Sequence, residues 1–204
     1  FNLYYLAIVG KVKQAIKSEE LRWYLGIILM STIMITINLM VNLNQTFGIA
    51  LKDAYFQVSS ILTTTGFATV DFNLWPTFSK IILITIMFIG GCAGSTGGGI
   101  KVSRIVILFK SLKREIQKLL HPNSVSPVKM EGELVESNVV KGVTVYFAFI
   151  IVLLFLGTLL VSFDGLDFTS TFTGVIACIN NIGPGLNLVG PMGNFDCFSY
   201  FSKI

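Results

Sequence analysis

The stretch that decides the fold runs from Leu51 to Arg104 and contains two glycine-bearing segments, Thr63-Thr64-Thr65-Gly66-Phe67 and Gly90-Gly91-Cys92-Ala93-Gly94-Ser95-Thr96-Gly97-Gly98-Gly99. A short apolar run precedes the first segment, and an uncharged run leads into the second. The apolar run, residues 51–62, would extend roughly 18 Å as a helix, too short to cross a bilayer. We interpret this order as a pore helix, a cation selectivity filter and an interrupted inner helix.

The composition is that of a membrane protein. Of 204 residues, 53% are hydrophobic and 13% are charged, about half the charged fraction of a soluble domain. The mean hydropathy is +0.75. Several uncharged runs reach the roughly 20 residues that a spanning helix needs. Uncharged runs cover residues 23–51, 54–70, 81–100, 142–163 and 168–195, and all but 54–70 have this length.

The net charge of +4 does not indicate a nucleic-acid partner, because the basic residues flank apolar spans and follow the positive-inside rule. Cys92, Cys178 and Cys197 lack metal-ligand spacing and are expected to be reduced packing residues. The sequence shows no nucleophile–base pair, so we expect no enzyme activity. The chain begins with Phe1 and has no signal-peptide pattern, so we expect more chain upstream.

The pattern divides the chain into two pore units and two connectors. Residues 1–20 are expected to be the end of a preceding helix and a cytoplasmic connector. The first pore unit is expected over 21–120. It would consist of a spanning helix (21–43), a pore helix (51–63), a filter (64–68) and a broken helix (75–120) interrupted by the loop 90–99. The expected second part is a cytoplasmic connector (121–138) and an incomplete unit over 139–204, with a spanning helix (139–162), a pore helix (168–180) and a filter (181–185).

Local signals set these boundaries. Asn44-Gln45-Thr46 and Gly48 are expected to end the first spanning helix, and Trp75-Pro76 to begin the broken one. Basic residues cluster on one side of the predicted spans, which makes that side cytoplasmic, and aspartates gather on the other.

The two units are related by a repeat. Shifting the chain by 117 positions places Gly66 on Gly183. The same shift pairs Gly48 with Gly165, Leu51 with Phe168, Tyr55 with Phe172 and Val58 with Val175. Internal repetition governs a fold assignment, and here it favours a pseudo-symmetric, channel-like body.

The glycines suit ion chemistry. A cation that sheds water needs replacement oxygens, which backbone carbonyls of an extended loop supply. Gly66 and Gly183 fit positions that need a positive φ or leave no room for a side chain. Six glycines within residues 90–99 do not form a stable helix, and a loop across an aqueous cavity would act as a gate. Lys101, near the membrane interior, would pair with an acidic group, bind loop carbonyls or repel cations.

Three segments resemble a known family. Thr63-Thr64-Thr65-Gly66-Phe67-Ala68-Thr69, Gly90 to Lys101, and Asn180-Asn181-Ile182-Gly183-Pro184-Gly185-Leu186 look like the membrane subunit of Trk/Ktr-type potassium transporters. The resemblance implies an all-α integral membrane fold of four helix–pore-helix–filter–helix repeats around one pore, a pseudo-tetrameric channel-like body. This chain would hold the end of repeat two, all of repeat three, and repeat four up to its last helix.

The resemblance also assigns roles by motif position. One filter wall would be Thr64, Thr65, Gly66 and Phe67, and another Asn181, Ile182, Gly183 and Pro184. The transported K⁺ would bind at Thr64, Thr65, Gly66, Asn181, Ile182 and Gly183. The gate would comprise Gly90, Gly91, Gly94, Ser95, Thr96, Gly97, Gly98, Gly99 and Lys101. The fourth filter lacks a Thr and contains Pro184, so a different carbonyl geometry is expected there.

The resemblance further implies a homodimer in membrane lipid, a cytoplasmic nucleotide-binding regulatory ring as partner, a bacterial inner-membrane location, and no organic cofactor. Alternatives are a tetrameric-type cation channel with identical filters, a Na⁺-permeable relative, and a membrane-embedded enzyme or receptor with re-entrant helices. A phosphate-binding loop is disfavoured, because Ile100 separates Gly99 from Lys101. Coupling to Na⁺ or H⁺ and passive flux both stay open.

Overall fold

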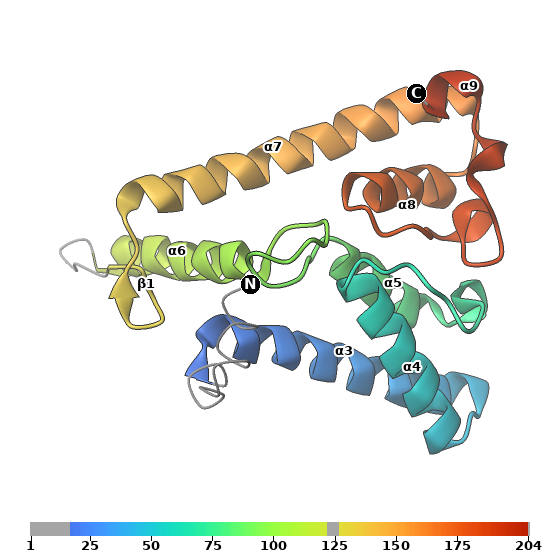
Figure 1. Cartoon of the computed structure of the whole chain (residues 1–204), viewed down its shortest axis with the longest axis horizontal. Helices are drawn as coiled ribbons and strands as arrows, with labels where there is room; N and C mark the ends of the chain where they lie inside the picture. Colours follow the sequence, from blue (N-terminus) through green and yellow to red (C-terminus); the bar gives the residue numbers. More distant parts are fainter. Residues whose placement is uncertain (1–16, 122–126, 204) are drawn as a thin grey trace.

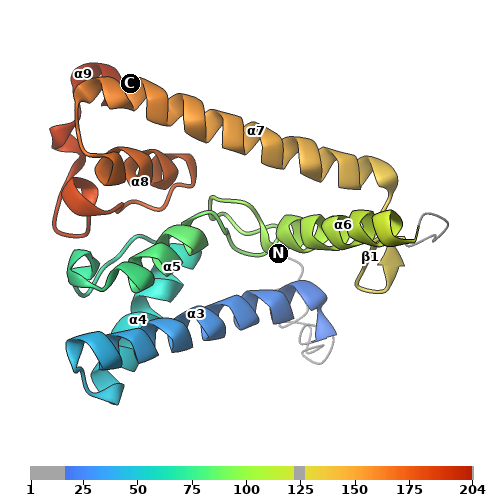
Figure 2. The ribbon, with the colours of Figure 1, turned by 180° about the vertical axis from the view of Figure 1, so that it is seen from behind.

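The computed structural model describes residues 17–121 and 127–203, and these residues are mostly helical. The preceding helix expected before residue 17 lies outside the described residues. Two described helices are long and apolar enough to cross a membrane, α3 (Glu19–Leu43) and α7 (Ser137–Val161). They run along opposite edges of the molecule (Figures 1 and 2). The shorter helices gather at one end between them (Figure 1), namely α4 (Phe47–Leu62), α5 (Thr77–Met87) and α8 (Phe168–Ile179).

Helix α3 begins at Glu19, two residues before the expected start, so Glu19 and Glu20 belong to the helix and not to the connector. Carboxylates in a first turn are stabilised by the positive end of the helix dipole. The helix ends at Leu43 because Asn44 adopts the left-handed conformation, with φ 50°. Asparagine is one of the residues that tolerates this conformation at a helix end.

Helix α4 (Phe47–Leu62) starts four residues before the pore helix expected at 51. The first spanning helix ends before Asn44 as expected, but Gly48 takes no part in that break because it already belongs to α4. Gly48 lies in the first turn, where its side-chain position meets nothing within 4 Å. A glycine costs a helix only about 1 kcal/mol. Burial of Ala50, Ala54 and Val58 on the inner face of α4 outweighs that cost.

The broken helix expected over 75–120 is two helices, α5 (Thr77–Met87) and α6 (Val102–Leu120). Trp75 and Pro76 precede α5 instead of starting it. Trp75 is extended, with φ −74° and ψ 155°, because a residue before proline is pushed out of the helical region. A short 3₁₀ helix, Phe72–Leu74, leads into this turn.

The connector after α6 contains a small hairpin, so the all-α expectation needs correction. Strand β1 (Lys129–Met130) pairs antiparallel with β2 (Glu133–Leu134), with Lys129 opposite Leu134. The turn residues Glu131 and Gly132 both have positive φ, 54° and 89°. Two such residues form the turn type whose twist matches a two-stranded hairpin.

The second unit follows the same plan as the first. Helix α7 starts at Ser137 and ends at Val161, within two residues of the expected 139–162, and continues as a 3₁₀ turn, Ser162–Asp164. Helix α8 spans Phe168–Ile179, one residue shorter than expected. Two 3₁₀ turns, Asn187–Val189 and Phe195–Cys197, and the short helix α9 (Tyr200–Lys203) complete the described chain.

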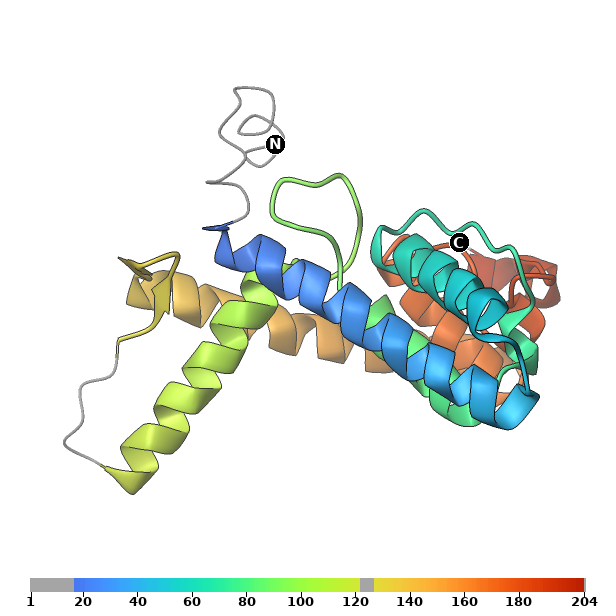
Figure 3. The same ribbon diagram turned by 90° about the horizontal axis from the view of Figure 1, so that it is seen from below.

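One hydrophobic core joins the two units. It contains Ile35 and Leu39 from α3, Leu62 from α4, Leu83 from α5 and Ile176 from α8, all at most 2% exposed. Full burial of such a side chain contributes about 1.5–3 kcal/mol. Helix α6 diverges from α3 and extends away from this core (Figure 3). The core therefore fixes the ends of α4 and α8 relative to each other.

Candidate ion pathway

The residues after α4 and α8 form the same turn. Thr64 and Asn181 are left-handed, with φ 54° and 51°, and two residues later Gly66 and Gly183 also have positive φ, 77° and 109°. These residues are 117 positions apart, the shift that relates the two units. A β-branched residue with positive φ is a backbone outlier, and such strain concentrates at functional sites.

The hydrogen bonds of the two turns also coincide. The Thr65 amide donates to Ser60 O at 2.9 Å, and the Ile182 amide donates to Ala177 O at 2.9 Å. The preceding amides, those of Thr64 and Asn181, bond three residues back at 3.0 and 3.2 Å. This pair of bonds is the Schellman motif, which satisfies carbonyls at a helix end.

The two turns meet. A Cβ built on Gly66 would lie 2.2 Å from Ile182 O, and one built on Gly183 would lie 3.7 Å from Gly66 Cα. A cavity of about 390 Å³ opens beside this contact. It is lined by Thr64, Thr65, Ala177, Cys178, Asn181, Ile182, Gly183 and Phe195. Five of the predicted filter residues therefore line the same cavity, and Gly66 is the residue of the first turn that contacts the second turn.

Phe67 and Pro184 are placed differently from the other predicted filter residues. Like Gly66, neither lines the cavity, and Phe67 is 71% exposed. The Phe67 carbonyl accepts a hydrogen bond of 2.6 Å from Ser60 Oγ. The Pro184 ring lies against Gly66, with its Cδ 3.3 Å from the built Cβ. These two residues border the turns and support their position.

The glycine-rich loop between α5 and α6 has a narrow neck. Residues 89 and 100 pair as a parallel bridge, in which the Gly90 amide donates to Ile100 O at 2.9 Å. A Cβ on Gly90 would lie 2.1 Å from Gly98 O, and one on Gly99 would lie 2.9 Å from the Gly90 nitrogen. Glycine is required here because the two limbs of the loop are in backbone contact.

The same loop lies against both turns. The Gly98 amide donates to Thr64 Oγ1 at 3.2 Å. A Cβ on Gly98 would lie 1.9 Å from Asn180 O, at the end of α8. The tip of the loop, from Ala93 to Thr96, is exposed and stands out from the helices (Figure 3). The loop therefore contacts both of the predicted filter segments.

Lys101 binds the loop. Its Nζ donates to Ser95 O and Ser95 Oγ, both at 3.0 Å, and also to Gly97 O. Of the three roles the sequence left open for Lys101, the contacts are those of a lysine that binds loop carbonyls. A cation that binds carbonyls on both sides of a turn stabilises that turn.

Sequence reasoning missed Glu20, which binds the loop from α3. Glu20 Oε1 accepts from the Ala93 amide at 2.7 Å and from the Ser103 amide at 3.1 Å. The residue is only 9% exposed. The sequence placed it in a polar connector, and its partners lie 73 and 83 residues away, so no local signal indicates this contact.

Sequence reasoning also missed Asn73, which connects the segments that follow the two turns. Its Nδ2 donates to Asn187 O at 3.1 Å, and its Oδ1 accepts from the Asn187 amide at 2.8 Å. The side chain of one unit thus pairs with the backbone of the other, 114 residues later, as a neighbouring strand would. This pair fixes the segments that follow the two turns.

Asp167 begins α8. Its carboxylate accepts from Ser170 Oγ at 2.6 Å and from the Ser170 amide at 3.0 Å, and also from Asn187 Nδ2. The Ser170 hydrogen bonds are the main cause that lowers the pKa of the Asp167 carboxyl below its ordinary value. An N-cap of this kind stabilises the start of a helix.

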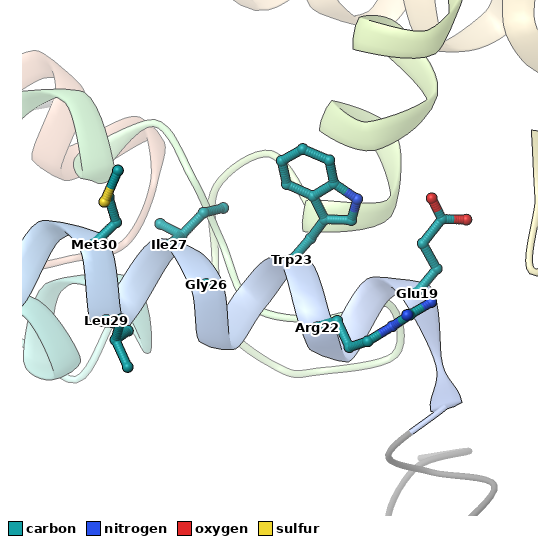
Figure 4. A pocket seen from close by; sticks show the side chains of 7 residues that line it. All are labelled: Glu19, Arg22, Trp23, Gly26, Ile27, Leu29 and Met30. Carbon is teal, nitrogen blue, oxygen red and sulfur yellow. The ribbon is translucent and has the colours of Figure 1, made fainter.

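Of the three cysteines, Cys178 lines the cavity between the turns and Cys92 lies in the glycine-rich loop. The three cysteines are free thiols, and within 17–121 and 127–203 no group of three His, Cys, Asp or Glu side chains forms a metal site. A groove of about 630 Å³ runs along the first turns of α3, where Trp23 reaches toward α6 (Figure 4). It shares no residue with the cavity between the turns.

The chain is similar to bacterial potassium transporters. Residues 15–204 match the family TrkH, described as cation transport protein. The chain is 36% identical over 191 residues to the Trk system potassium uptake protein TrkH of Salmonella typhimurium, which covers 93% of this chain and 40% of that protein. It is 37% identical over 190 residues to TrkG of Escherichia coli K12, covering 91% of this chain and 38% of that protein.

The fold is also similar to that of a solved potassium transporter. The crystal structure of the potassium transporter TrkH from Vibrio parahaemolyticus aligns with a TM-score of 0.88 and 33% sequence identity, covering all of this chain and 43% of that one. The present chain therefore spans about 40% of the length of the relatives it matches.

Proposed function

Because this chain belongs to the TrkH family of cation transport proteins, we propose that it supplies two walls of a potassium pathway across the cell membrane. It is part of an integral membrane transporter, and its family is not one of enzymes. The observation that carries the proposal is the contact between two turns of the same backbone type, at Thr64–Gly66 and Asn181–Gly183, beside one cavity.

The turns have the chemistry that a dehydrated K⁺ requires. Carbonyls of non-helical backbone replace the hydration shell, and such backbone is tolerated at membrane depth only beside protein or a water-filled path. We assign K⁺ coordination to the carbonyls of Thr64, Thr65, Gly66, Asn181, Ile182 and Gly183. Because α4 and α8 both end at these turns, the negative end of each helix dipole lies close to the ion.

The glycine-rich loop is proposed as the gate of this pathway. Its contacts with Thr64 and Asn180 support a position directly against the filter segments. Glycines at the neck permit the two limbs to pass each other closely. Lys101 stabilises the compact form of the loop, and displacement of the loop would open the space beneath the turns.

The remaining walls and partners belong to the whole protein. The chain covers about 40% of its relatives, so two further repeats outside it would complete a four-repeat pore. We propose a homodimer with a cytoplasmic nucleotide-binding ring, as the family resemblance implies. Exposed apolar side chains on α3 and α7, such as Leu29 and Val145, would face lipid or neighbouring repeats.

A tetrameric channel of single-repeat subunits would have identical filters, whereas the two turns here differ in side chains. At equivalent positions of the repeat, Thr64 corresponds to Asn181 and Phe67 to Pro184.

A Na⁺-permeable pathway is the second candidate. Glycine at both Gly66 and Gly183 favours K⁺, because any side chain at Gly66 would reach the neighbouring carbonyl.

The test is transport by the full-length protein. It is expressed in a bacterial strain without its own K⁺ uptake systems, and Rb⁺ and Na⁺ uptake are measured at low external K⁺. We expect growth at low K⁺ and Rb⁺ uptake that exceeds Na⁺ uptake. Equal uptake of the two ions would favour the Na⁺-permeable candidate, and uptake of neither by a well-expressed protein would refute both.

A further inference from the structure

We propose that Glu20 is a positioning residue that holds the glycine-rich loop in its closed place from outside the loop. This inference rests on the proposed role of the loop as a gate. Glu20 belongs to the first turn of α3, the spanning helix that precedes the loop by about 70 residues in the chain. It does not border the cavity between the turns, so its effect on ions would act through the loop.

One carboxylate oxygen joins both sides of the loop. Glu20 Oε1 accepts from the Ala93 amide, on the entering limb, at 2.7 Å. It also accepts from the Ser103 amide, in the first turn of α6, at 3.1 Å. The loop cannot move away from α6 without loss of one of these bonds.

The bond to Ser103 also satisfies the start of α6. The N-cap residue Lys101 makes no side-chain hydrogen bond to its own helix. The first amides of a helix need acceptors, and a carboxylate at this end is stabilised by the helix dipole. Glu20 therefore caps α6 from another helix, which links the cap to the position of the loop.

The Glu20 carboxylate is buried and depends on hydrogen bonds from backbone amides. Glu20 is 9% exposed, and within residues 17–121 and 127–203 no Lys, Arg or His nitrogen lies within ion-pair distance of it. A buried carboxylate is costly unless hydrogen bonds stabilise it. The Ala93 amide reaches Glu20 only when the loop lies against α6, whereas the Ser103 amide belongs to α6 itself, so displacement of the loop would leave the buried carboxylate with one donor fewer.

The rest of the loop is held in few places. Among the described residues, side-chain hydrogen bonds connect residues 91–99 to other segments only at Glu20, Thr64 and Lys101. Lys101, the N-cap residue of α6, contacts the loop at Ser95 and Gly97. Thr64 holds the limb at the filter, and Glu20 holds the opposite limb. Removal of Glu20 would free the limb that contains Cys92 and Ala93.

The experiment uses the thiol of Cys92, which is half-buried and adjacent to Ala93, as a reporter. In the full-length protein, other cysteines are replaced by serine, and the rate of Cys92 modification by a maleimide is measured in detergent. E20A is expected to raise this rate at least about tenfold, the effect of one charge-assisted hydrogen bond. Basal Rb⁺ flux in cells should rise with it.

Two conservative variants separate position from charge. E20Q keeps the length and an acceptor oxygen and should restore most of the protection, whereas E20D keeps the charge but is too short and should resemble E20A. E115A, which removes an exposed carboxylate paired with Arg114, is the matched control and should leave labelling and flux unchanged.

Unchanged Cys92 labelling in E20A would overturn the proposal, as would rescue by E20D but not by E20Q. Labelling is independent of transport. If the wild-type protein carries no K⁺ but E20A still accelerates labelling, the proposed function fails while the positioning role stands. If the wild type transports K⁺ and E20A changes neither readout, the positioning role alone fails.

Discussion

Replacement of Gly66 by serine tests the contact between the two turns. Gly66 has φ +77°, and its Cβ position lies 2.2 Å from the Ile182 carbonyl oxygen and 3.3 Å from its carbon. Ordinary van der Waals contact begins at 3.4 Å, so the side chain must displace a backbone carbonyl of the neighbouring turn. No flexible side-chain end is available there to move instead.

The cost has two parts. A non-glycine residue in the left-handed region costs roughly 1–2 kcal/mol. Displacement of the Ile182 carbonyl removes one oxygen from the proposed K⁺ site, and a buried polar group that loses its partner costs about 1–3 kcal/mol. The turns are supported by the shared core, so we expect the fold to survive. The preference for K⁺ over Na⁺ should fall by about tenfold or more.

The assay compares Rb⁺ and Na⁺ uptake by wild-type and G66S protein in cells without other K⁺ uptake systems. G183S is informative, because its Cβ meets only Gly66 Cα at 3.7 Å, so strain at φ +109° acts with little steric displacement. We expect a smaller selectivity loss than in G66S. G48S, in open space on α4, is the matched control. Wild-type selectivity in well-expressed G66S would refute the reasoning.

Three further predictions follow from the surrounding contacts. Deletion of residues 94–98 should raise basal Rb⁺ flux, since it removes the loop contact with Thr64; flat flux in a well-expressed deletion protein would contradict the gate. N73A should lower K⁺ selectivity and thermal stability by removing two hydrogen bonds to Asn187, about 1–3 kcal/mol, measured by uptake and Tm. D167N should destabilise α8 by about 1 kcal/mol at neutral pH. Folding lowers the pKa of the Asp167 carboxyl, so the stabilisation it provides is present above the unfolded value of 3.8 and is lost as pH falls through the folded pKa. The difference in unfolding free energy between wild type and D167N should therefore shrink as pH falls through the folded pKa. A difference that does not change with pH would contradict this.

The repeat could be predicted from the sequence because it depends on local residue patterns. Gly66 and Gly183 each follow a short apolar run, and the shift of 117 residues that pairs them also pairs Leu62 with Ile179, the last residues of α4 and α8. A glycine after a helix marks a required backbone conformation, which the two turns adopt. The position of these glycines therefore followed from residue type and spacing.

Other features depend on contacts that spacing does not reveal. Gly48 was expected to contribute to the break after the first spanning helix, but it lies inside α4, where burial of one helix face outweighs the low helix propensity of one residue. Glu20 and Asn73 act on partners 73 to 114 residues away, so their roles appear only when the chain is folded. The hairpin at 129–134 has only two residues per strand, too few for an alternating pattern.

The most direct test of the pathway is an experimental map of the full-length protein with Rb⁺ bound. Anomalous scattering locates the ion without reference to the protein fit. Our account predicts a Rb⁺ peak coordinated by carbonyls of Thr64–Gly66 and of Asn181–Gly183 together. A peak elsewhere in the protein, with these carbonyls turned away from it, would contradict the account.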